Sequence, residues 1–125
     1  MKLRIKGNSI RLRLSQREVS DFARNARVED SISFGNRKLT YALIKLNQAK
    51  EILASFENDR IEIGVPAAIA DEWTQSEQVG FDAGQKLSGG ETLKILVEKD
   101  FACLTAREGE DESDAFPHPQ AGQAC

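Results

Sequence analysis

The chain has few of the residue types that usually carry nucleophilic or metal chemistry. Its 125 residues include one histidine, His118, and two cysteines, Cys103 and Cys125, all near the C-terminal end. A catalytic triad is therefore hard to build. A Cys103–His118 nucleophile pair would need the C-terminal segment to dock with both side chains within hydrogen-bond reach. In a reducing compartment the two cysteines are expected to be thiols and not a disulfide.

Long apolar runs are also missing. The first fourteen residues alternate charged and aliphatic side chains, so they lack the apolar stretch of roughly 7–15 residues that a secretory signal needs. No segment approaches the ~18 apolar residues of a membrane-spanning helix. We therefore expect a cytoplasmic protein without a membrane partner.

The net charge of the chain is small, but the charged residues are unevenly distributed. The formal net charge is −3, whereas residues 1–27 carry eight Lys and Arg against two acids, a charge of +6. Residues 108–114 carry five carboxylates and no base. An acidic chain is unusual for a dedicated nucleic-acid-binding protein, so nucleic acid is not an expected partner. A local basic surface is not excluded.

The first half of the chain predicts two hairpins around a helix. Residues 2–14 alternate basic and aliphatic side chains on both sides of Gly7-Asn8, a pair suited to a tight turn. Ser15-Gln-Arg-Glu18 fits a capping box, which predicts a helix over about 16–26. Strands are expected at 28–34 and, apolar on both faces and so central, from residue 39.

The second half repeats this plan. Strands are expected at 52–56 and 61–65, a helix from Pro66, a short strand at 78–81, a Gly-rich loop over 82–90 and a strand over 93–97. An offset of 51 takes Ile10 to Ile61 and Phe22 to Trp73, and also takes Val28 to Val79. After three extra residues, placed in the Gly-rich loop, an offset of 54 takes Leu39 to Leu93. We infer two copies of a strand–strand–helix–strand–strand unit, with both aromatic helix residues in the core.

The fold class that follows is α+β. Because tight turns join neighbouring strands antiparallel, we expect a mainly antiparallel, curved or barrel-like sheet of about eight strands with two helices and pseudo-two-fold duplication of a ββαββ unit. One domain would occupy residues 1–104, with repeat one at 1–47 and repeat two at 50–100. Residues 105–125 would form an acidic tail.

Two resemblances accompany this interpretation. The opening KLRIKGNSIRLRLSQREV and the stretch LVEKDFACLTAREGEDESDAFPHP resemble a small bacterial family catalogued as a domain of unknown function, which implies no activity. In topology the duplicated unit is similar to the CYTH-like triphosphate tunnel proteins, whose tunnel binds phosphates through Lys and Arg and a divalent metal through Glu. The E-x-E-x-K strand of that family is replaced here by Lys2-Leu-Arg4-Ile-Lys6. The departure weighs against metal-dependent phosphohydrolase chemistry and leaves anion binding open.

The basic row of the first hairpin is the leading candidate site. Its cations share one face of the hairpin, and Arg suits bidentate recognition of phosphate or carboxylate. The alternative is the solvated face of a sheet, neutralised by Glu62 or Glu98 on neighbouring strands. We expect a binding protein rather than an enzyme, with a phosphorylated small molecule or an acidic protein segment as its partner. The predicted anion-binding residues are Arg4, Lys6, Arg11, Arg13 and Lys94.

Three further patterns give weaker candidates. A tetrahedral zinc site could be formed by Cys103, His118 and Cys125 with Asp111 or Asp114. The protein would then be a metal-clipped interaction module. The spacing typical of metal ligands is absent, however, and a frayed acidic extension is favoured. The Gly-rich loop around Lys86 would cradle a phosphate, although a flexible hairpin loop is favoured because the P-loop pattern is absent. A divergent tri- or polyphosphate phosphohydrolase would hold Mg²⁺ through Glu62, Glu98 or tail acids. In another role, acids of the tail would fold back over the basic hairpin and occupy it. These acids are Glu110, Asp111, Glu112 and Asp114.

Overall fold

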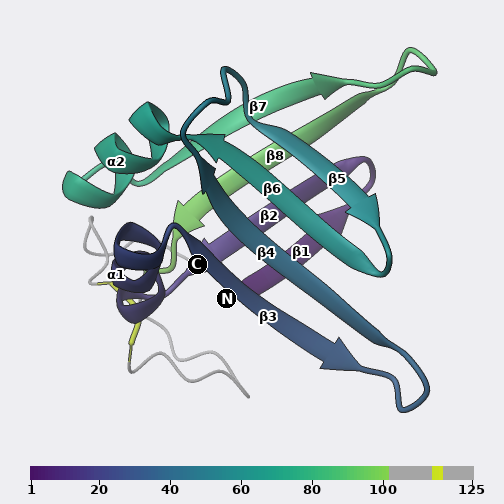
Figure 1. The fold of residues 1–125 in the computed structure, drawn as a ribbon, viewed down its shortest axis with the longest axis horizontal. Coiled ribbons are helices and arrows are strands. Elements are labelled where there is room, and N and C mark those ends of the chain that lie inside the picture. Colours follow the sequence, from purple (N-terminus) through teal and green to yellow (C-terminus); the bar gives the residue numbers. More distant parts are fainter. Residues whose placement is uncertain (102–113, 117–125) are drawn as a thin grey trace, which may run out of the picture.

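The order strand–strand–helix–strand–strand occurs twice along the chain (Figure 1). This computed structural model describes residues 1–101 and 114–116. The first unit comprises β1 (Lys2–Lys6), β2 (Ser9–Leu14), α1 (Gln16–Asn25), β3 (Arg27–Ser33) and β4 (Lys38–Leu46). The second comprises β5 (Leu53–Glu57), β6 (Arg60–Pro66), α2 (Ala67–Gln75), β7 (Gly80–Lys86) and β8 (Thr92–Lys99).

The strands form two mixed four-stranded sheets. Sheet A has the order β1-β2-β8-β7 and sheet B the order β3-β4-β6-β5. Each hairpin is antiparallel, but the central pairs β2–β8 and β4–β6 are parallel. The α+β class is therefore confirmed. Four of the six strand pairs are antiparallel. The expectation of one barrel-like sheet is wrong, because a helix separates the two hairpins of each unit and sends them to different sheets, with no closed barrel among the described strands.

The two units pair in the same register. An offset of 51 takes β1 and β2 onto β5 and β6, and an offset of 54 takes β4 onto β8. The pairs Ile10↔Ile95 and Ile61↔Tyr41 are related in this way. Sheet A and sheet B therefore present position-matched faces, and one can be compared with the other residue by residue.

The third strand of each unit corrects one predicted equivalence. Val28 lies opposite Leu43 in sheet B, and Phe81 lies opposite Val97 in sheet A. Val28 therefore corresponds to Phe81 at an offset of 53, and not to Val79. Two of the three extra residues lie between α2 and β7, and the third lies in the loop after β7.

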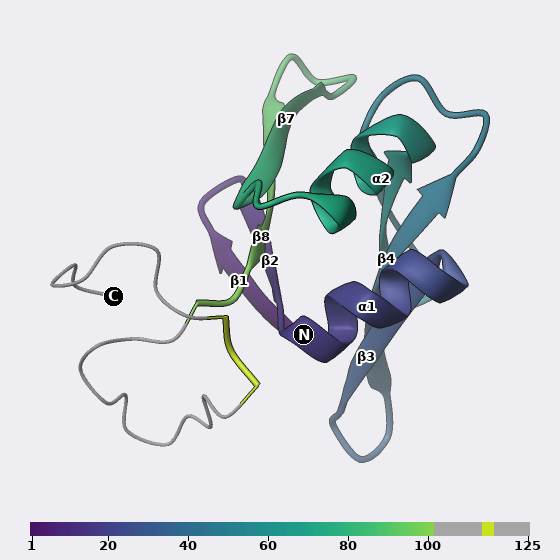
Figure 2. The same ribbon diagram turned by 90° about the vertical axis from the view of Figure 1, so that its left-hand side faces the viewer.

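Both helices lie at one end of the molecule between the two sheets (Figure 2). The Ser15 hydroxyl accepts from the Glu18 amide at 3.3 Å, and the Glu18 carboxylate accepts from the Ser15 amide at 2.9 Å, as the capping-box pattern predicts. Phe22 and Trp73 are fully buried, with ring centroids 6.2 Å apart. Trp73 also meets Phe81 edge-on at 5.2 Å. The predicted core role of both helix aromatics is confirmed.

Contacts between sheet edges hold the two sheets face to face. The Gln85 side-chain amide donates to the Ala54 carbonyl at 3.1 Å and accepts from the Ala54 amide at 2.7 Å. These bonds connect β7 to β5. On the other side, the Tyr41 hydroxyl donates to the Met1 carbonyl at 3.1 Å. The apolar inner faces of both sheets thereby share one core, whose fully buried members include Leu12, Leu14, Leu43, Ile63 and Val65.

A short C-terminal segment contacts the start of α1. The Gln16 amide donates to the Asp114 carbonyl at 3.1 Å, and the Phe116 amide donates to the Asp100 carbonyl at 2.6 Å. The rings of Phe101 and Phe116 lie 5.6 Å apart. Asp114 is therefore at the N-terminus of α1 and not over the basic hairpin, which corrects the expectation for this acid. Among the described residues no helix is long and apolar enough to cross a membrane.

Candidate functional site

The outer face of sheet A, which points away from the core, carries the predicted basic row. Strand register fixes two lines of side chains across this face. One line runs Asp82–Leu96–Arg11–Arg4, and the next runs Gly84–Lys94–Ser9–Lys6. Cations from β1, β2 and β8 are thereby brought onto one surface, although β8 is about ninety residues from β1 in the sequence.

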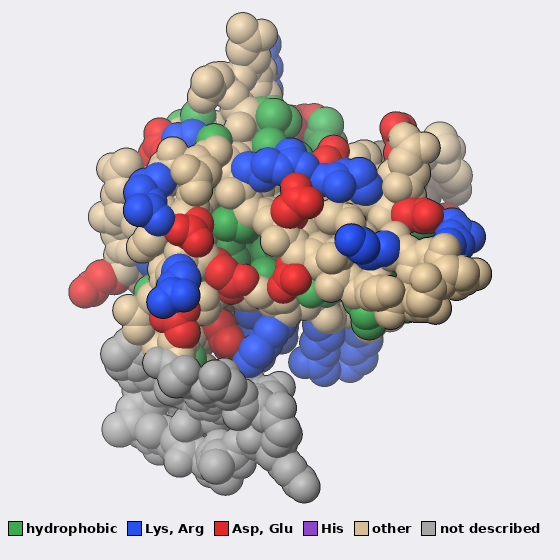
Figure 3. Space-filling model, turned by 60° about the horizontal axis from the view of Figure 1, so that its bottom comes forward, with side chains coloured by type: hydrophobic (Ala, Val, Ile, Leu, Met, Phe, Trp, Pro, Cys, Tyr) green, Lys and Arg blue, Asp and Glu red, His purple; other side chains and the backbone are tan. Residues whose placement is uncertain are grey.

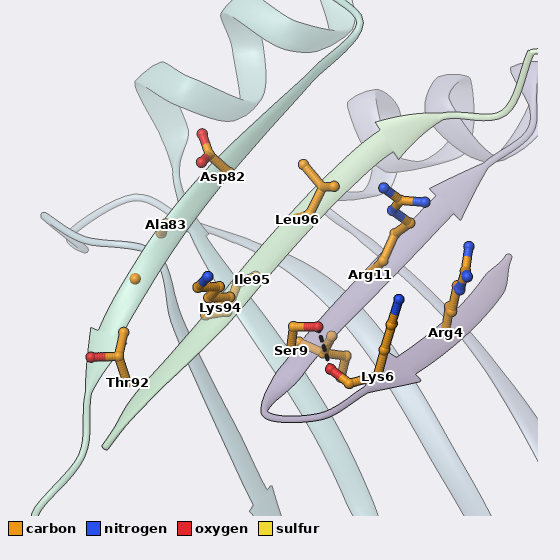
Figure 4. Close-up of a pocket in the computed structure, with 12 residues that line it drawn as sticks. Arg4, Lys6, Ser9, Arg11, Asp82, Ala83, Thr92, Lys94, Ile95 and Leu96 are labelled. Atoms are coloured by element: carbon orange, nitrogen blue, oxygen red, sulfur yellow. Dashed lines mark hydrogen bonds between the residues drawn. The ribbon is translucent and has the colours of Figure 1, made fainter. Parts of the chain in front are cut away.

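A groove with a volume of about 630 Å³ follows these two lines. Arg4 and Lys6 rise from β1 and Arg11 from β2, all on the same side of the sheet, while Lys94 lies on β8 and Asp82 on β7 (Figure 4). We call this feature the cationic groove. Its lining is Arg4, Lys6, Ser9, Ile10, Arg11, Asp82, Ala83, Gly84, Thr92, Lys94, Ile95 and Leu96.

Most of the predicted basic residues are thus placed together. Arg4, Lys6, Arg11 and Lys94 line the groove. Arg13 lies one line nearer to α1, beside Glu98. The geometry brings these cations onto one face, and their role in anion binding stays a prediction.

One carboxylate serves two of these arginines. The Glu98 carboxylate lies 3.2 Å from Nε of Arg11 and 3.7 Å from Nε of Arg13. Arg4, Lys6 and Lys94 make no ion pair with any residue in the described part of the chain. The expectation that Glu98 neutralises the row therefore holds for two arginines and not for the remaining cations of the groove.

The matched positions of sheet B are neutralised internally. Arg27 pairs with Glu29 at 2.8 Å and with Glu62 at 3.5 Å, and Arg60 lies 3.4 Å from each of the same two acids. A hydrogen bond from Arg27 is the main reason that the pKa of Glu29 lies below its usual value; burial opposes this effect, and the charges of Arg27 and Arg60 add to the lowering. Two bases and two acids thus form a closed network, which the equivalent positions of sheet A do not.

Other parts of the surface mix the two signs of charge. Over much of the face seen in Figure 3, basic and acidic side chains are interspersed. Alternation of this kind is what a solvated protein surface usually shows. A groove with several unneutralised cations differs from that background.

The carboxylates proposed for a divalent metal do not meet. Glu62 lies on the outer face of sheet B with Arg27 and Arg60, and Glu98 lies on the outer face of sheet A with Arg11. No group of three potential metal ligands forms within residues 1–101 and 114–116. Glu62 and Glu98 therefore do not form a joint metal site, which the alternative of a divergent phosphohydrolase would need if it used both of these acids. Cys103, Asp111, His118 and Cys125 lie outside the described residues, as do the tail acids Glu110 and Glu112.

The predicted Gly-rich loop begins later than expected. Residues Asp82–Lys86 belong to β7 and pair with β8, so they form an extended edge strand and not a loop. Only residues 87–91 connect the two strands, closed by a hydrogen bond from the Leu87 amide to the Glu91 carbonyl at 2.9 Å. A backbone phosphate cradle over 82–86 is therefore not formed.

Because a loop was predicted over residues 82–90, Asp82 was not identified from the sequence as a residue of the groove. Asp82 was assigned to a loop, yet it lies on β7 at the end of the line that contains Arg11. The alternation of Phe81, Ala83 and Gln85 with polar or small residues was the available signal. A strand over these residues would have placed Asp82 on the outer face.

Comparisons with known proteins give one match. A model described as a family of unknown function (DUF7009) matches residues 1–120. No curated protein and no solved structure matches the chain. The expected resemblance to a family of unknown function is confirmed, and similarity to the CYTH-like proteins is not shown.

Proposed function

The chain belongs to this family of unknown function, and we propose from its geometry that it binds a small anion, phosphorylated or carboxylated, in the cationic groove. The observation that carries the proposal is the set of cations without an acidic partner among the described residues. Arg4, Lys6 and Lys94 line one groove with Arg11, whose nearest acid is shared with Arg13. Like charges placed directly opposite each other on a sheet are destabilising, so a bound anion would relieve the repulsion.

Comparison with sheet B supports a specific anion site on sheet A over a basic surface without a function. Arg11 of sheet A corresponds to Glu62 of sheet B, and Arg4 corresponds to Ser55. The same backbone positions therefore carry a balanced network in one sheet and an unbalanced one in the other. If the outer face of sheet A were only a solvated surface, a balanced network like that of sheet B would be enough.

The chemistry of the side chains suits oxyanions. An Arg guanidinium presents a planar fork of donors that matches phosphate and carboxylate, and Lys adds a point charge. The Nε atom of Arg11 lies 3.2 Å from a Glu98 carboxylate oxygen, and we propose that the terminal nitrogens of Arg11 bind the ligand. We propose Glu98 as a positioning residue that holds Arg11 across the sheet. The groove volume of about 630 Å³ lies within the range of small-molecule sites.

Calorimetric titration with pyrophosphate at low salt tests the proposal. We expect heat of binding that weakens as salt rises, since exposed charges are screened. Arg4→Gln with Arg11→Gln should weaken binding about tenfold or more, because charge-assisted hydrogen bonds are lost.

A matched control separates the site from net charge. Lys38 lies on the outer face of sheet B and Lys50 precedes β5, and both are exposed. Lys38→Gln with Lys50→Gln removes the same charge and should leave pyrophosphate binding nearly unchanged. Equal losses in the two double variants, or no binding by the unmodified protein, would refute the site. Tighter binding of a hexaglutamate peptide than of pyrophosphate would refute the assignment to a small anion and favour an acidic protein segment.

A further inference from the structure

The opposite end of the groove carries an acid, and we infer that the ligand is dipolar, with an oxyanion at Arg4 and Arg11 and an ammonium group at Asp82. This inference rests on the proposed anion site and deepens it. Asp82 lies on β7, which is the far edge of sheet A from β1 (Figure 4). Its exposed side chain lines the same groove as the cations.

Register sets the spacing between the two charged ends. Asp82 lies opposite Leu96, and Leu96 lies beside Arg11. Neighbouring strands are roughly 4.8 Å apart, so two spacings separate the backbones of Asp82 and Arg11 by about 10 Å. At that separation the acid does not neutralise Arg11 directly, and a ligand several bonds long can reach both residues.

Asp82 does not have the ion-pair partners that its counterpart on sheet B has. It corresponds to Glu29, which pairs with Arg27 and Arg60. The residues of sheet A at those two arginine positions are Gly80 and Ser9. No ion pair links Asp82 to any residue that the structure describes. The carboxylate is therefore available to a cation from outside the chain.

The floor directly between Asp82 and Arg11 is apolar, and Lys94 lies beside it in the adjacent line. The half-buried Leu96 lies between Asp82 and Arg11. Gly84, in the adjacent line, presents no side chain to the groove. A short hydrocarbon or ring segment that joins an amine to a phosphate would rest on this floor and keep both charges at its ends. The ligand class that fits is a small phosphorylated or carboxylated amine.

Paired probes test the inference on the full chain. Hexyl phosphate and 6-aminohexyl phosphate differ only in the terminal amine, and O-phosphoethanolamine is too short to span the groove. We expect the amine of 6-aminohexyl phosphate to tighten binding about threefold to fivefold over hexyl phosphate, the range of an exposed ion pair. O-phosphoethanolamine should show no such gain over ethyl phosphate. Asp82→Asn should abolish the gain while hexyl phosphate binds as well as before or better. Glu72→Gln on α2 serves as the matched control, because Glu72 is exposed and makes no ion pair with any described residue.

The outcomes separate this inference from the function that it extends. If hexyl phosphate binds and depends on Arg11, but the amine adds nothing or Asp82→Asn keeps the gain, the dipolar ligand is refuted and the anion site stands. If neither phosphate binds, or binding is indifferent to Arg11→Gln, the anion site fails as well. A gain that Glu72→Gln removes equally would show that the amine responds to net charge, and would also overturn the role of Asp82.

Discussion

Replacing Arg4 by Glu should stabilise the fold while it abolishes anion binding. Arg4 lies directly opposite Arg11 in the β1–β2 hairpin and has no acidic partner among the described residues. Like charges in this position destabilise a sheet, and opposite charges contribute roughly 0.2–1 kcal/mol. Arg4→Glu converts the first arrangement into the second, so we expect the free energy of unfolding to rise by about 0.5–1.5 kcal/mol at low salt.

Urea unfolding is the appropriate assay, because guanidinium chloride would screen the charges. With a urea dependence of roughly 1–3 kcal/mol per molar for a small domain, the midpoint should rise by about 0.2–1.5 M. Salt well above 0.15 M shortens the Debye length to less than about 8 Å, so most of the gain should then disappear.

Two variants bracket this result. Arg4→Gln removes only the repulsion and should give about half of the gain. Ser55→Glu, at the equivalent position of sheet B opposite Glu62, creates a like-charge pair and should lower stability. A fall in stability for Arg4→Glu, or a gain that salt does not change, would show that the cations are neutralised in a way that the groove geometry misses.

Three further variants test the fold and its electrostatics. Trp73→Ala should cost about 3–5 kcal/mol of unfolding free energy, because this fully buried ring contacts both Phe22 and Phe81; a loss below 1 kcal/mol in a urea melt would contradict its central place. Ser15→Ala should cost about 1 kcal/mol by the same measurement, and an unchanged midpoint would mean that the cap is not needed. Burial lowers the pKa of Lys99 from its ordinary value of 10.5, and the charge of Glu77 partly offsets this effect. Between the folded pKa and 10.5 the unfolded chain therefore binds more protons than the folded chain, so the free energy of unfolding rises with pH. Lys99→Met should remove that rise on the alkaline side, as the pH approaches 10.5 from below, whereas the control Lys50→Met should keep it; equal slopes would disprove the effect of burial.

Local structure was predictable where one segment contains its own signal. The capping box Ser15–Glu18 marks the start of α1, and alternation with a Gly7 turn marks the first hairpin. Each of these elements is stabilised by residues within a few positions of one another. The internal repeat was also readable, because its core aliphatic positions recur at a fixed offset.

Pairing between the units was not predictable in the same way. The contact of β2 with β8 joins segments about eighty residues apart, and no turn chemistry specifies it. Tight turns dictate antiparallel neighbours only within a hairpin, so the parallel central pairs and the separation into two sheets escaped the sequence pattern. The groove depends on that pairing. Arg4 and Arg11 were predictable from their own hairpin, whereas Asp82 lies on a strand for which the sequence predicted a loop. Lys94 was predicted, but its position across from Ser9 was not.

An NMR titration with pyrophosphate tests the central claim most directly. Backbone amide shifts of the unmodified protein would be followed as pyrophosphate is added at low salt. We predict shift changes concentrated on β1, β2 and β8 around Arg4, Arg11 and Lys94, with little change around Arg60 and Glu62 on the matched face of sheet B. Changes of equal size on both faces, or no changes in sheet A, would contradict an anion site in the cationic groove.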